Sequence, residues 1–496
     1  MRHTLFLALL WVALLPTVLP AQSEVAAEPI VGLRENPVAG FAFVNAEVVV
    51  APGQMITDAT VLVEGTSITA VGQQLAIPEG YQEIDCEGKR IYPGLIDAWS
   101  EIDVTVNESP PGYWNGNVTP QMRAVSSIAR VPDAAKLRSQ GITARLVAPK
   151  GGIVKGSSCL MLTGEESAGR SLLLEDAWQH LQLTVPRGGS RAKYPNSPMG
   201  AVALLRQSFY DAAWYEDAWN AYTATPELDR PDKNVALQAL SEAIKTGTFL
   251  IDAPNERMAI RADDLAREFS LQTILRGSGR EYRQLDEIVA TNRPLLVPVD
   301  FPDTPDVKTA DAARDVTLQE LMHWELAPEN PGRLVRAGVK ICLTTDGLDD
   351  VGQFLKQVRV AVERGLDEDE ALAAVTVVPA ELLGVESEVG RIEPGMVANL
   401  TITDGNLFAE TTKVAECWVA GKRFVIDGNP QTEFPELAGN WEFAVRHPSV
   451  RNMRLLLELE GSDGKLNGAV RSGESAPKPV KAKQRKKEKN KQKDID

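Results

Sequence analysis

The chain has 496 residues, 44% of them hydrophobic, and is long enough to bury a large core as one large domain plus a smaller one. Its formal net charge of −16 argues against nucleic-acid binding by the body of the protein. The charge is uneven, because residues 478–496 contain nine Lys or Arg and three Asp or Glu. That excess leaves −22 on the rest of the chain.

Residues 1–21 have the pattern of a secretory signal peptide. Arg2 gives a positive start, residues 5–19 are nearly all apolar, and Leu19-Pro20-Ala21 is a suitable cleavage site. The pattern predicts export, either to the periplasm or out of the cell. An uncleaved membrane anchor is the alternative, because the apolar run approaches the length of a short span. No later stretch is long and apolar enough to cross a bilayer, so we expect no transmembrane domain after cleavage.

Two segments far apart in the sequence are predicted to form a small β domain. Residues 41–90 alternate apolar and polar side chains between turn signals, which is typical of short antiparallel strands. A similar pattern returns within residues 388–427. We expect both segments to contribute strands to one domain, with the intervening residues 91–385 inserted into it.

Residues 91–385 alternate short apolar runs with helical patterns, as a parallel α/β barrel requires. After an opening strand that follows Pro93-Gly94 within residues 91–101, strands are predicted at residues 142–147, 158–162, 248–252, 271–275, 294–299 and 339–344. A further strand, fourth in order, is expected within residues 165–185, where the periodicity is too poor to place it. Helices are predicted at residues 234–246, 260–269, 318–326, 351–364 and 369–378.

The C-terminal part divides into two regions. Residues 428–470 contain alternating stretches that predict a small β appendage. Residues 471–496 are dominated by Pro, Lys, Gln and Glu, and we expect a disordered basic tail. A solvating role is favoured for this tail, and contact with anionic cell-envelope polymers is the alternative.

The four cysteines are too widely spaced for a zinc ribbon or a small disulfide-dense scaffold. Cys159 and Cys342 lie in apolar, strand-like runs, which favours buried thiols. Cys86 and Cys417 fall in the two segments of the predicted β domain. A bridge between them is left open, since export permits disulfides.

The segment from Ile91 to Glu101, which contains Pro-Gly-Leu-Ile-Asp-Ala-Trp-Ser-Glu, resembles the first barrel strand of the amidohydrolase superfamily. Residues 390–402 and 339–346 are similar to its late β segment and its eighth strand. The resemblance extends over residues 41–426, and residues 118–124 and 323–331 are similar to a secreted bacterial branch. It implies an α/β fold, namely a (β/α)8 TIM-like barrel inserted into a small β-sandwich formed by the N- and C-terminal segments.

The resemblance also implies a metal-dependent hydrolase that acts on C–N bonds other than peptide bonds, with His ligands on the first, fifth and sixth strands. Trp99 and Glu101 stand where the first two His belong. The fifth strand ends in Asp252-Ala253-Pro254, and Gly277 occupies the sixth-strand position. A carboxylated Lys on the fourth strand cannot be placed because the strand itself is not placed.

Histidine is scarce throughout the chain. His3 belongs to the predicted signal peptide, His323 to a helix and His447 to the appendage; the fourth is His180. None lies at the end of a predicted strand, so we expect no imidazole metal centre.

By resemblance, Asp346 ends the eighth strand at the position of the acid–base aspartate, and it is the candidate catalytic residue. Capping of the following loop or helix is an equally good explanation of this carboxylate. Glu101, Asp252 and Asp346 would all project into the barrel mouth. Three carboxylates without an imidazole would suit Mg²⁺, Mn²⁺ or Ca²⁺ better than zinc.

We therefore predict an amidohydrolase-like protein without the usual metal site. No cofactor is expected, and the protein would bind an unidentified small molecule or a catalytic amidohydrolase relative. Trp99 favours a closed pocket or an apolar platform for a ligand. By resemblance, the glycine-rich stretch at residues 149–158 would line the mouth. The alternative is an active hydrolase with a divalent metal held by Glu101, Asp252 and Asp346.

Overall fold

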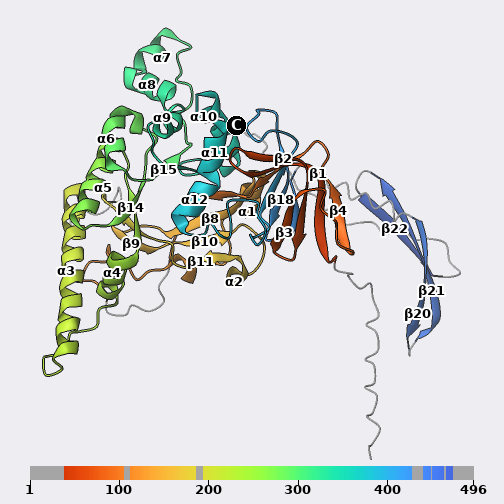
Figure 1. The fold of residues 1–496 in the computed structure, drawn as a ribbon, viewed down its shortest axis with the longest axis horizontal. Coiled ribbons are helices and arrows are strands. Elements are labelled where there is room, and N and C mark those ends of the chain that lie inside the picture. Colours follow the sequence, from red (N-terminus) through yellow and green to blue (C-terminus); the bar gives the residue numbers. More distant parts are fainter. Residues whose placement is uncertain are drawn as a thin grey trace, which may run out of the picture. The chain divides into compact units, whose positions relative to one another are not determined.

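The computed structural model describes residues 38–104, 112–185 and 194–426, together with the backbone of residues 439–447, 450–462 and 465–472. The predicted signal peptide and residues 473–496 of the predicted tail lie outside these ranges. Among the described residues, no helix has the length and apolar character needed to span a membrane. The described chain is a mixed α/β fold (Figure 1).

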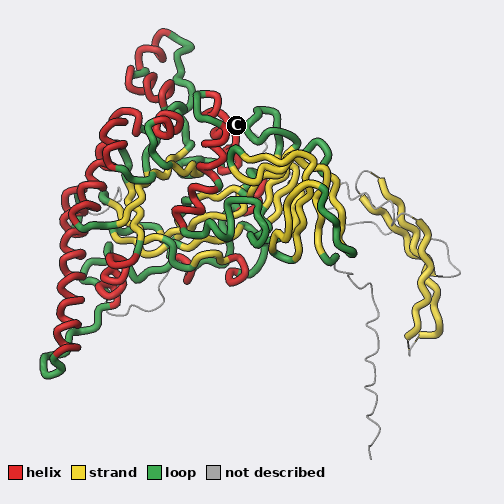
Figure 2. The backbone as a smooth tube through the Cα atoms, in the orientation of Figure 1, coloured by secondary structure: helices red, strands yellow, loops and turns green. Residues whose placement is uncertain are grey.

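The first and last described parts of the main body share one eight-stranded sheet. Its order is β19-β18-β17-β5-β1-β2-β3, with β4 paired to β1, and its strands lie side by side in Figure 2. The antiparallel prediction holds for the first three strands, whereas β4 and β5 pair in parallel with β1. The sequence-distant strands β5 and β17 pair directly. The strand bounds are β1 (Gly40–Ala51), β2 (Gln54–Glu64), β3 (Ser67–Gln73), β4 (Tyr81–Asp85), β5 (Arg90–Pro93), β17 (Leu400–Thr403), β18 (Val414–Val419) and β19 (Lys422–Val425).

A second set of strands pairs mainly in parallel. β6 pairs in parallel with β8, and β12 to β16 form five consecutive parallel strands. The strand missed within residues 165–185 is β12. The prediction for residues 158–162 was wrong in direction, because β10 runs antiparallel to β8, and β9 runs antiparallel to β12. The bounds are β6 (Leu95–Asp97), β7 (Glu101–Ile102), β8 (Ile142–Pro149), β9 (Val154–Ser157), β10 (Cys159–Leu162), β11 (Leu172–Leu174), β12 (Trp178–Gln182), β13 (Thr248–Asp252), β14 (Gln272–Arg276), β15 (Leu295–Pro298) and β16 (Ile341–Thr344).

The helices largely follow the sequence pattern. α8 is found with its predicted bounds, and α4 begins one residue after the capping side chain of Asn234. The longest described helix, α3, was not predicted; it is capped by Ser197 and begins with proline. The bounds are α1 (Ala134–Ser139), α2 (Ala168–Ser171), α3 (Pro198–Ala224), α4 (Val235–Thr246), α5 (Glu256–Glu268), α6 (Leu285–Thr291), α7 (Ala310–Asp315), α8 (Leu318–Leu326), α9 (Asn330–Arg336), α10 (Phe354–Glu363), α11 (Glu368–Val375) and α12 (Val377–Leu383).

The predicted appendage contains a three-stranded antiparallel sheet. Its strands are β20 (Gly439–His447), β21 (Val450–Ser462) and β22 (Lys465–Ser472). The last strand extends two residues into the segment that we expected to be disordered from residue 471.

All four cysteines are buried and none is in a disulfide, so Cys86 and Cys417 are not bridged. Burial raises the pKa of the Cys86 thiol to about 11, and it raises the pKa values of Cys159 and Cys417 to about 12. These thiols are therefore protonated at neutral pH.

A buried ion pair connects β6, the first strand of the parallel set, with its neighbour β8. Hydrogen bonds from the pair reach the end of β16, the last strand of the set. Arg145 on β8 lies 2.9 Å from the carboxylate of Asp97 on β6. Thr345, directly after β16, donates its hydroxyl to Asp97 Oδ2 over 2.6 Å and accepts a hydrogen bond from Arg145. Because Asp97 is fully buried, its charge depends on these partners.

We expect Arg145→Met to reduce the free energy of unfolding by about 3–5 kcal/mol, since it leaves the Asp97 carboxylate buried without its cation. Urea unfolding followed by circular dichroism measures this loss. The matched control is Arg314→Met, because Arg314 is 80% exposed and pairs with an exposed aspartate. Equal stability of the two variants would contradict the role assigned to the buried pair.

Candidate functional site

Charged side chains from several strands meet at one end of the parallel set. Asp252 and Arg276 are the last residues of the paired strands β13 and β14, Asp346 follows β16, and Glu101 begins β7. Lys155 joins them from β9. We call these five residues the strand-end cluster. The carboxyl ends of parallel strands are the usual place for functional groups in such folds.

Lys155 lies between two of the carboxylates. Its Nζ is 2.5 Å from Asp252 Oδ2 and 2.7 Å from Glu101 Oε1, and its side chain is only 2% exposed. Burial opposes the charged form, but Asp252 and Glu101 outweigh it and raise the pKa of the ammonium. Lys155 is therefore a buried ammonium that is protonated at neutral pH.

Arg276 neutralises the remaining carboxylate. Its Nε and Nη2 donate to the two oxygens of Asp346 over 2.9 and 2.8 Å, which is a bidentate pair. Its Nη1 also lies 3.3 Å from Asp252 Oδ1. Burial disfavours an ionised Asp252, yet the charges of Lys155 and Arg276 hold its pKa below the usual range. Every carboxylate of the strand-end cluster thus has a cationic partner.

Trp99 packs against both cations. The Lys155 Nζ lies 5.7 Å from the centre of its ring, and the Arg276 guanidinium carbon lies 4.2 Å from it. These are cation–π distances, and the indole is almost completely buried. Trp99 thus helps to position the two cations.

His180 lies close to Trp99 beside this cluster, although it could be assigned to no strand from the sequence. It lies within β12, its ring centre is 5.5 Å from that of Trp99, and neither ring nitrogen has a hydrogen-bond partner in the described structure. Burial, followed by the charge of Lys155, lowers its pKa to about 3. The imidazole is therefore neutral at neutral pH. We missed it because β12 could not be located in the sequence.

The residues present do not fit a catalytic metal ion. Glu101 and Asp252 share the Lys155 ammonium, and Asp346 is bound by Arg276. A divalent ion would need to displace these cations and the hydrogen bonds they donate. Within the described ranges, no three His, Cys, Asp or Glu side chains are grouped as a metal site requires.

The other candidate positions do not join the cluster. His323 on α8 lies 3.1 Å from the hydroxyl of Tyr282.

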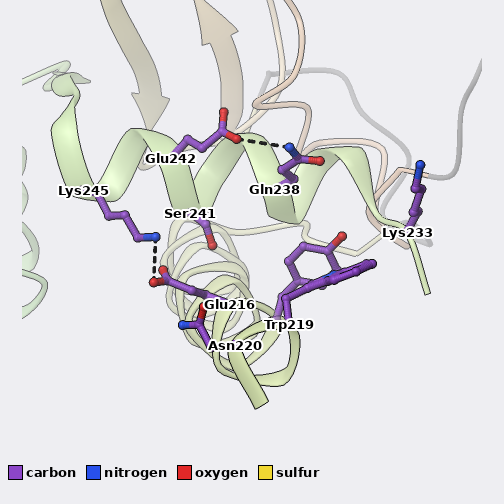
Figure 3. A pocket seen from close by; sticks show the side chains of 9 residues that line it. Glu216, Trp219, Asn220, Lys233, Gln238, Ser241, Glu242 and Lys245 are labelled. Carbon is purple, nitrogen blue, oxygen red and sulfur yellow. Dashed lines mark hydrogen bonds and ion pairs between the residues drawn. The ribbon is translucent and has the colours of Figure 1, made fainter. Parts of the chain in front are cut away.

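A separate hollow of about 330 Å³ lies between α3 and α4, beside Tyr215 and Trp219 (Figure 3). In it, Lys245 pairs with Glu216 over 2.6 Å, and Gln238 donates to Glu242. These charges are already paired on the two helices, away from the strand ends.

Comparison with known proteins agrees with this arrangement of elements. A family model described as Amidohydrolase family matches residues 329–430. The amidohydrolase tasK of Hapsidospora irregularis is 21% identical over 405 residues, covering 73% of this chain. The chain is similar to amidohydrolases over these residues. It spans 39% of the length of tasK, about two fifths.

A solved structure supports the fold. An amidohydrolase from Thermotoga maritima MSB8 is 20% identical, with a TM-score of 0.63, and the match covers 78% of this chain and all of that one. Identity at this level shows the shared fold and leaves the activity open.

Sequence reasoning found the carboxylates of the site and missed its cations. Glu101, Asp252 and Asp346 were predicted to project into one opening, and the structure brings them together around Lys155 and Arg276. The glycine-rich stretch at residues 149–158, expected near this opening, delivers Lys155 to it. The one available signal was a single lysine in the short stretch Val154–Ser157.

We expect His180→Gln to weaken the acid sensitivity of the fold. The folded-state pKa of about 3 lies below that of an unfolded histidine, about 6.5, so acid protonates the unfolded chain first. His180 therefore lowers stability as the pH falls from about 6.5 towards 3, by roughly 3 kcal/mol between pH 7 and pH 4.

Urea unfolding at pH 7, 5.5 and 4 measures this difference between the wild-type protein and His180→Gln. The comparison variant is Arg314→Gln, because the side chain of Arg314 is 80% exposed and its replacement should leave the wild-type pH dependence unchanged. An unchanged pH dependence in His180→Gln would show that His180 does not remain neutral in the fold.

Proposed function

We propose that this chain is a non-hydrolytic, metal-independent member of the superfamily that binds a small ligand or a catalytic amidohydrolase relative. In finer detail, we propose a (β/α)8 barrel inserted into a β-sandwich, in an exported protein. The parallel strands β6, β8 and β12 to β16, and the sheet shared by the two terminal segments, support this architecture. The signal-peptide pattern of residues 1–21 supports export.

The observation that carries the proposal is the position of the Lys155 ammonium between Glu101 and Asp252. Metal-dependent hydrolysis of C–N bonds requires a cation that turns water into hydroxide near neutral pH. Lys155 and Arg276 supply positive charge at the strand ends, but neither is a Lewis acid with open coordination positions.

The side chains at the site also offer no good substitute for a metal-bound hydroxide. An efficient general base has a pKa near the working pH, whereas the pKa of His180 is about 3. Lys155 carries its proton at neutral pH and cannot accept another. Asp346, the candidate acid–base residue, has both oxygens bound by Arg276. These constraints favour binding over hydrolysis.

The alternative is an active hydrolase with a metal held by Glu101, Asp252 and Asp346. Its support is the family resemblance and the convergence of the three carboxylates. Against it stands the charge balance, since one divalent ion would add two positive charges to a cluster in which each carboxylate is already paired.

A ligand would approach the cluster at its open side. The side chains of Glu101 and Arg276 are 25% and 26% exposed, and that of Asp346 is 17% exposed, while Lys155 and Asp252 lie deeper. The accessible groups are thus the carboxylates of Glu101 and Asp346 and the guanidinium of Arg276. They present hydrogen-bond donors and acceptors to a polar ligand above the buried face of Trp99.

We expect protein purified without chelator to contain less than about one tenth of a divalent ion per chain, measured by inductively coupled plasma mass spectrometry. EDTA should leave its melting temperature unchanged, because no resident ion stabilises the fold. N-acyl amino acids should not be hydrolysed above the buffer rate, with or without added Zn²⁺ or Mn²⁺.

A metal-containing amidohydrolase treated in parallel is the control, and it should lose both ion and stability in EDTA. About one bound ion per chain, together with an EDTA-induced fall in melting temperature, would contradict the proposal and support the carboxylate-metal alternative. Pull-down with the exported chain then distinguishes the two binding roles by the presence of a catalytic relative.

A further inference from the structure

The hollow between α3 and α4 is bordered by two aromatic side chains. Tyr215 and Trp219 of α3 line it, and their ring centres lie 6.2 Å apart in an edge-to-face arrangement. Its volume of about 330 Å³ falls within the range of small-molecule sites, about 300–1,000 Å³. The hollow is therefore large enough for a small molecule that carries an aromatic group.

Three hydrogen-bond donors beside these rings have no acceptor in the described part of the chain. The indole N–H of Trp219 is buried without a partner. Tyr215 is only 7% exposed; its hydroxyl accepts from the backbone N–H of Asn234 over 3.2 Å, and its own proton has no acceptor. Lys233, the residue before Asn234, lines the hollow and forms no ion pair there. Because buried donors without acceptors are uncommon, this end of the hollow suits a ligand that supplies oxygen atoms.

A carboxylate without a cation lies further along α4. Glu242 accepts from the Gln238 amide over 3.1 Å but has no cationic partner within the described ranges, whereas Glu216 is paired with Lys245. The helical rise of about 1.5 Å per residue puts residue 242 about 10 Å beyond the start of α4. Figure 3 shows Glu242 and Lys233 at different points along this helix, with Lys233 just before its first residue. The hollow thus presents an unpaired cation and an unpaired anion at separate ends.

We propose that this hollow is a second ligand site, which binds a short peptide with free termini and an aromatic C-terminal residue. The terminal carboxylate meets Lys233 and the Tyr215 hydroxyl, near the positively polarised amino end of α4. A peptide carbonyl supplies the acceptor for the Trp219 N–H, and the aromatic ring packs beside the indole. The terminal ammonium meets Glu242.

The distance between the two charges favours a dipeptide over a single amino acid. A dipeptide extends over about 7 Å, and the flexible side chains of Lys233 and Glu242 cover the remaining distance. The charges of one amino acid lie too close together to reach both. The hollow is separate from the strand-end cluster, so this inference does not rest on the function proposed for that cluster.

The test titrates the dipeptide alanyl-phenylalanine into the full chain by isothermal titration calorimetry. One dipeptide should bind per chain at millimolar or lower concentration. N-acetylation removes the ammonium and C-terminal amidation removes the carboxylate, and each should weaken binding at least about threefold. Alanyl-glycine, which lacks the ring, should also bind more weakly. These ligand changes test the contacts without altering the protein.

Three variants locate the ligand. Lys233→Gln and Glu242→Gln each remove one charge, and Trp219→Phe keeps an aromatic ring but removes the N–H. Each should weaken dipeptide binding at least about threefold at an unchanged melting temperature. Amidation of the dipeptide should cost Lys233→Gln no further affinity, and N-acetylation should cost Glu242→Gln none, because the partner is already gone.

Two control variants should bind the dipeptide as the wild-type chain does. Lys136→Gln removes an exposed lysine paired with Asp350, and Asp346→Asn changes the strand-end cluster. Absence of binding to the wild-type chain at millimolar dipeptide would overturn the inference. Unchanged binding in all three hollow variants would overturn it too, as would loss of binding in Asp346→Asn alone, which would place the peptide at the strand ends. The metal content of the chain, which tests the function proposed above, is unaffected by any of these results.

Discussion

The ion pair between Lys155 and Asp252 is the interaction on which the rest of the site depends. Both side chains are almost completely removed from water, where an uncompensated charge costs several kcal/mol. A second carboxylate on Lys155 and a second cation on Asp252 offset that cost. The four side chains come from β7, β9, β13 and β14, so neutralising the charge also fixes the ends of these strands relative to one another.

This arrangement separates two roles that a metal ion combines. An ion in a hydrolase balances the charge of its ligands and also activates water. Lys155 and Arg276 provide the first through their carboxylate partners, and the Arg276 guanidinium also lies against the Trp99 face. The position of Trp99 fits the same logic, because an aromatic face stabilises cations whereas an imidazole can bind a metal.

The sequence was sufficient where periodicity and end signals agree. α8 was located because Thr317 and Glu320 form a capping box before an apolar helix, and the paired terminal segments because their strands alternate cleanly. The helix α3 was not predicted because aromatic and small apolar residues also occupy its exposed face. Trp214 is one of them, so the sequence shows no single apolar stripe. The direction of β10 depends on pairing with β8, which a short apolar run does not encode.

The same limit applies to the site. The sequence placed the carboxylates of Asp252 and Asp346 at the ends of predicted strands. Because parallel strands bring their carboxyl ends to one edge of the sheet, these carboxylates were expected to lie together. Lys155 was not expected there, because it lies on the antiparallel strand β9, and its sequence neighbours Val154 and Gly156 carry no charge. His180 was missed because its strand, β12, could not be located in the sequence. Partners that are 97 residues apart, as Lys155 and Asp252 are, become evident only through tertiary pairing.

None of the four thiols is in a disulfide, and in the folded chain all four should react slowly with oxidants. A thiol that is both buried and protonated supplies neither the access nor the thiolate that disulfide exchange requires. In an oxidising compartment the native molecule would keep its cysteines reduced without help from a reductase. Only chains that unfold locally would expose a thiol to an alkylating reagent. The extent of alkylation at each cysteine would then report how often that part of the fold opens.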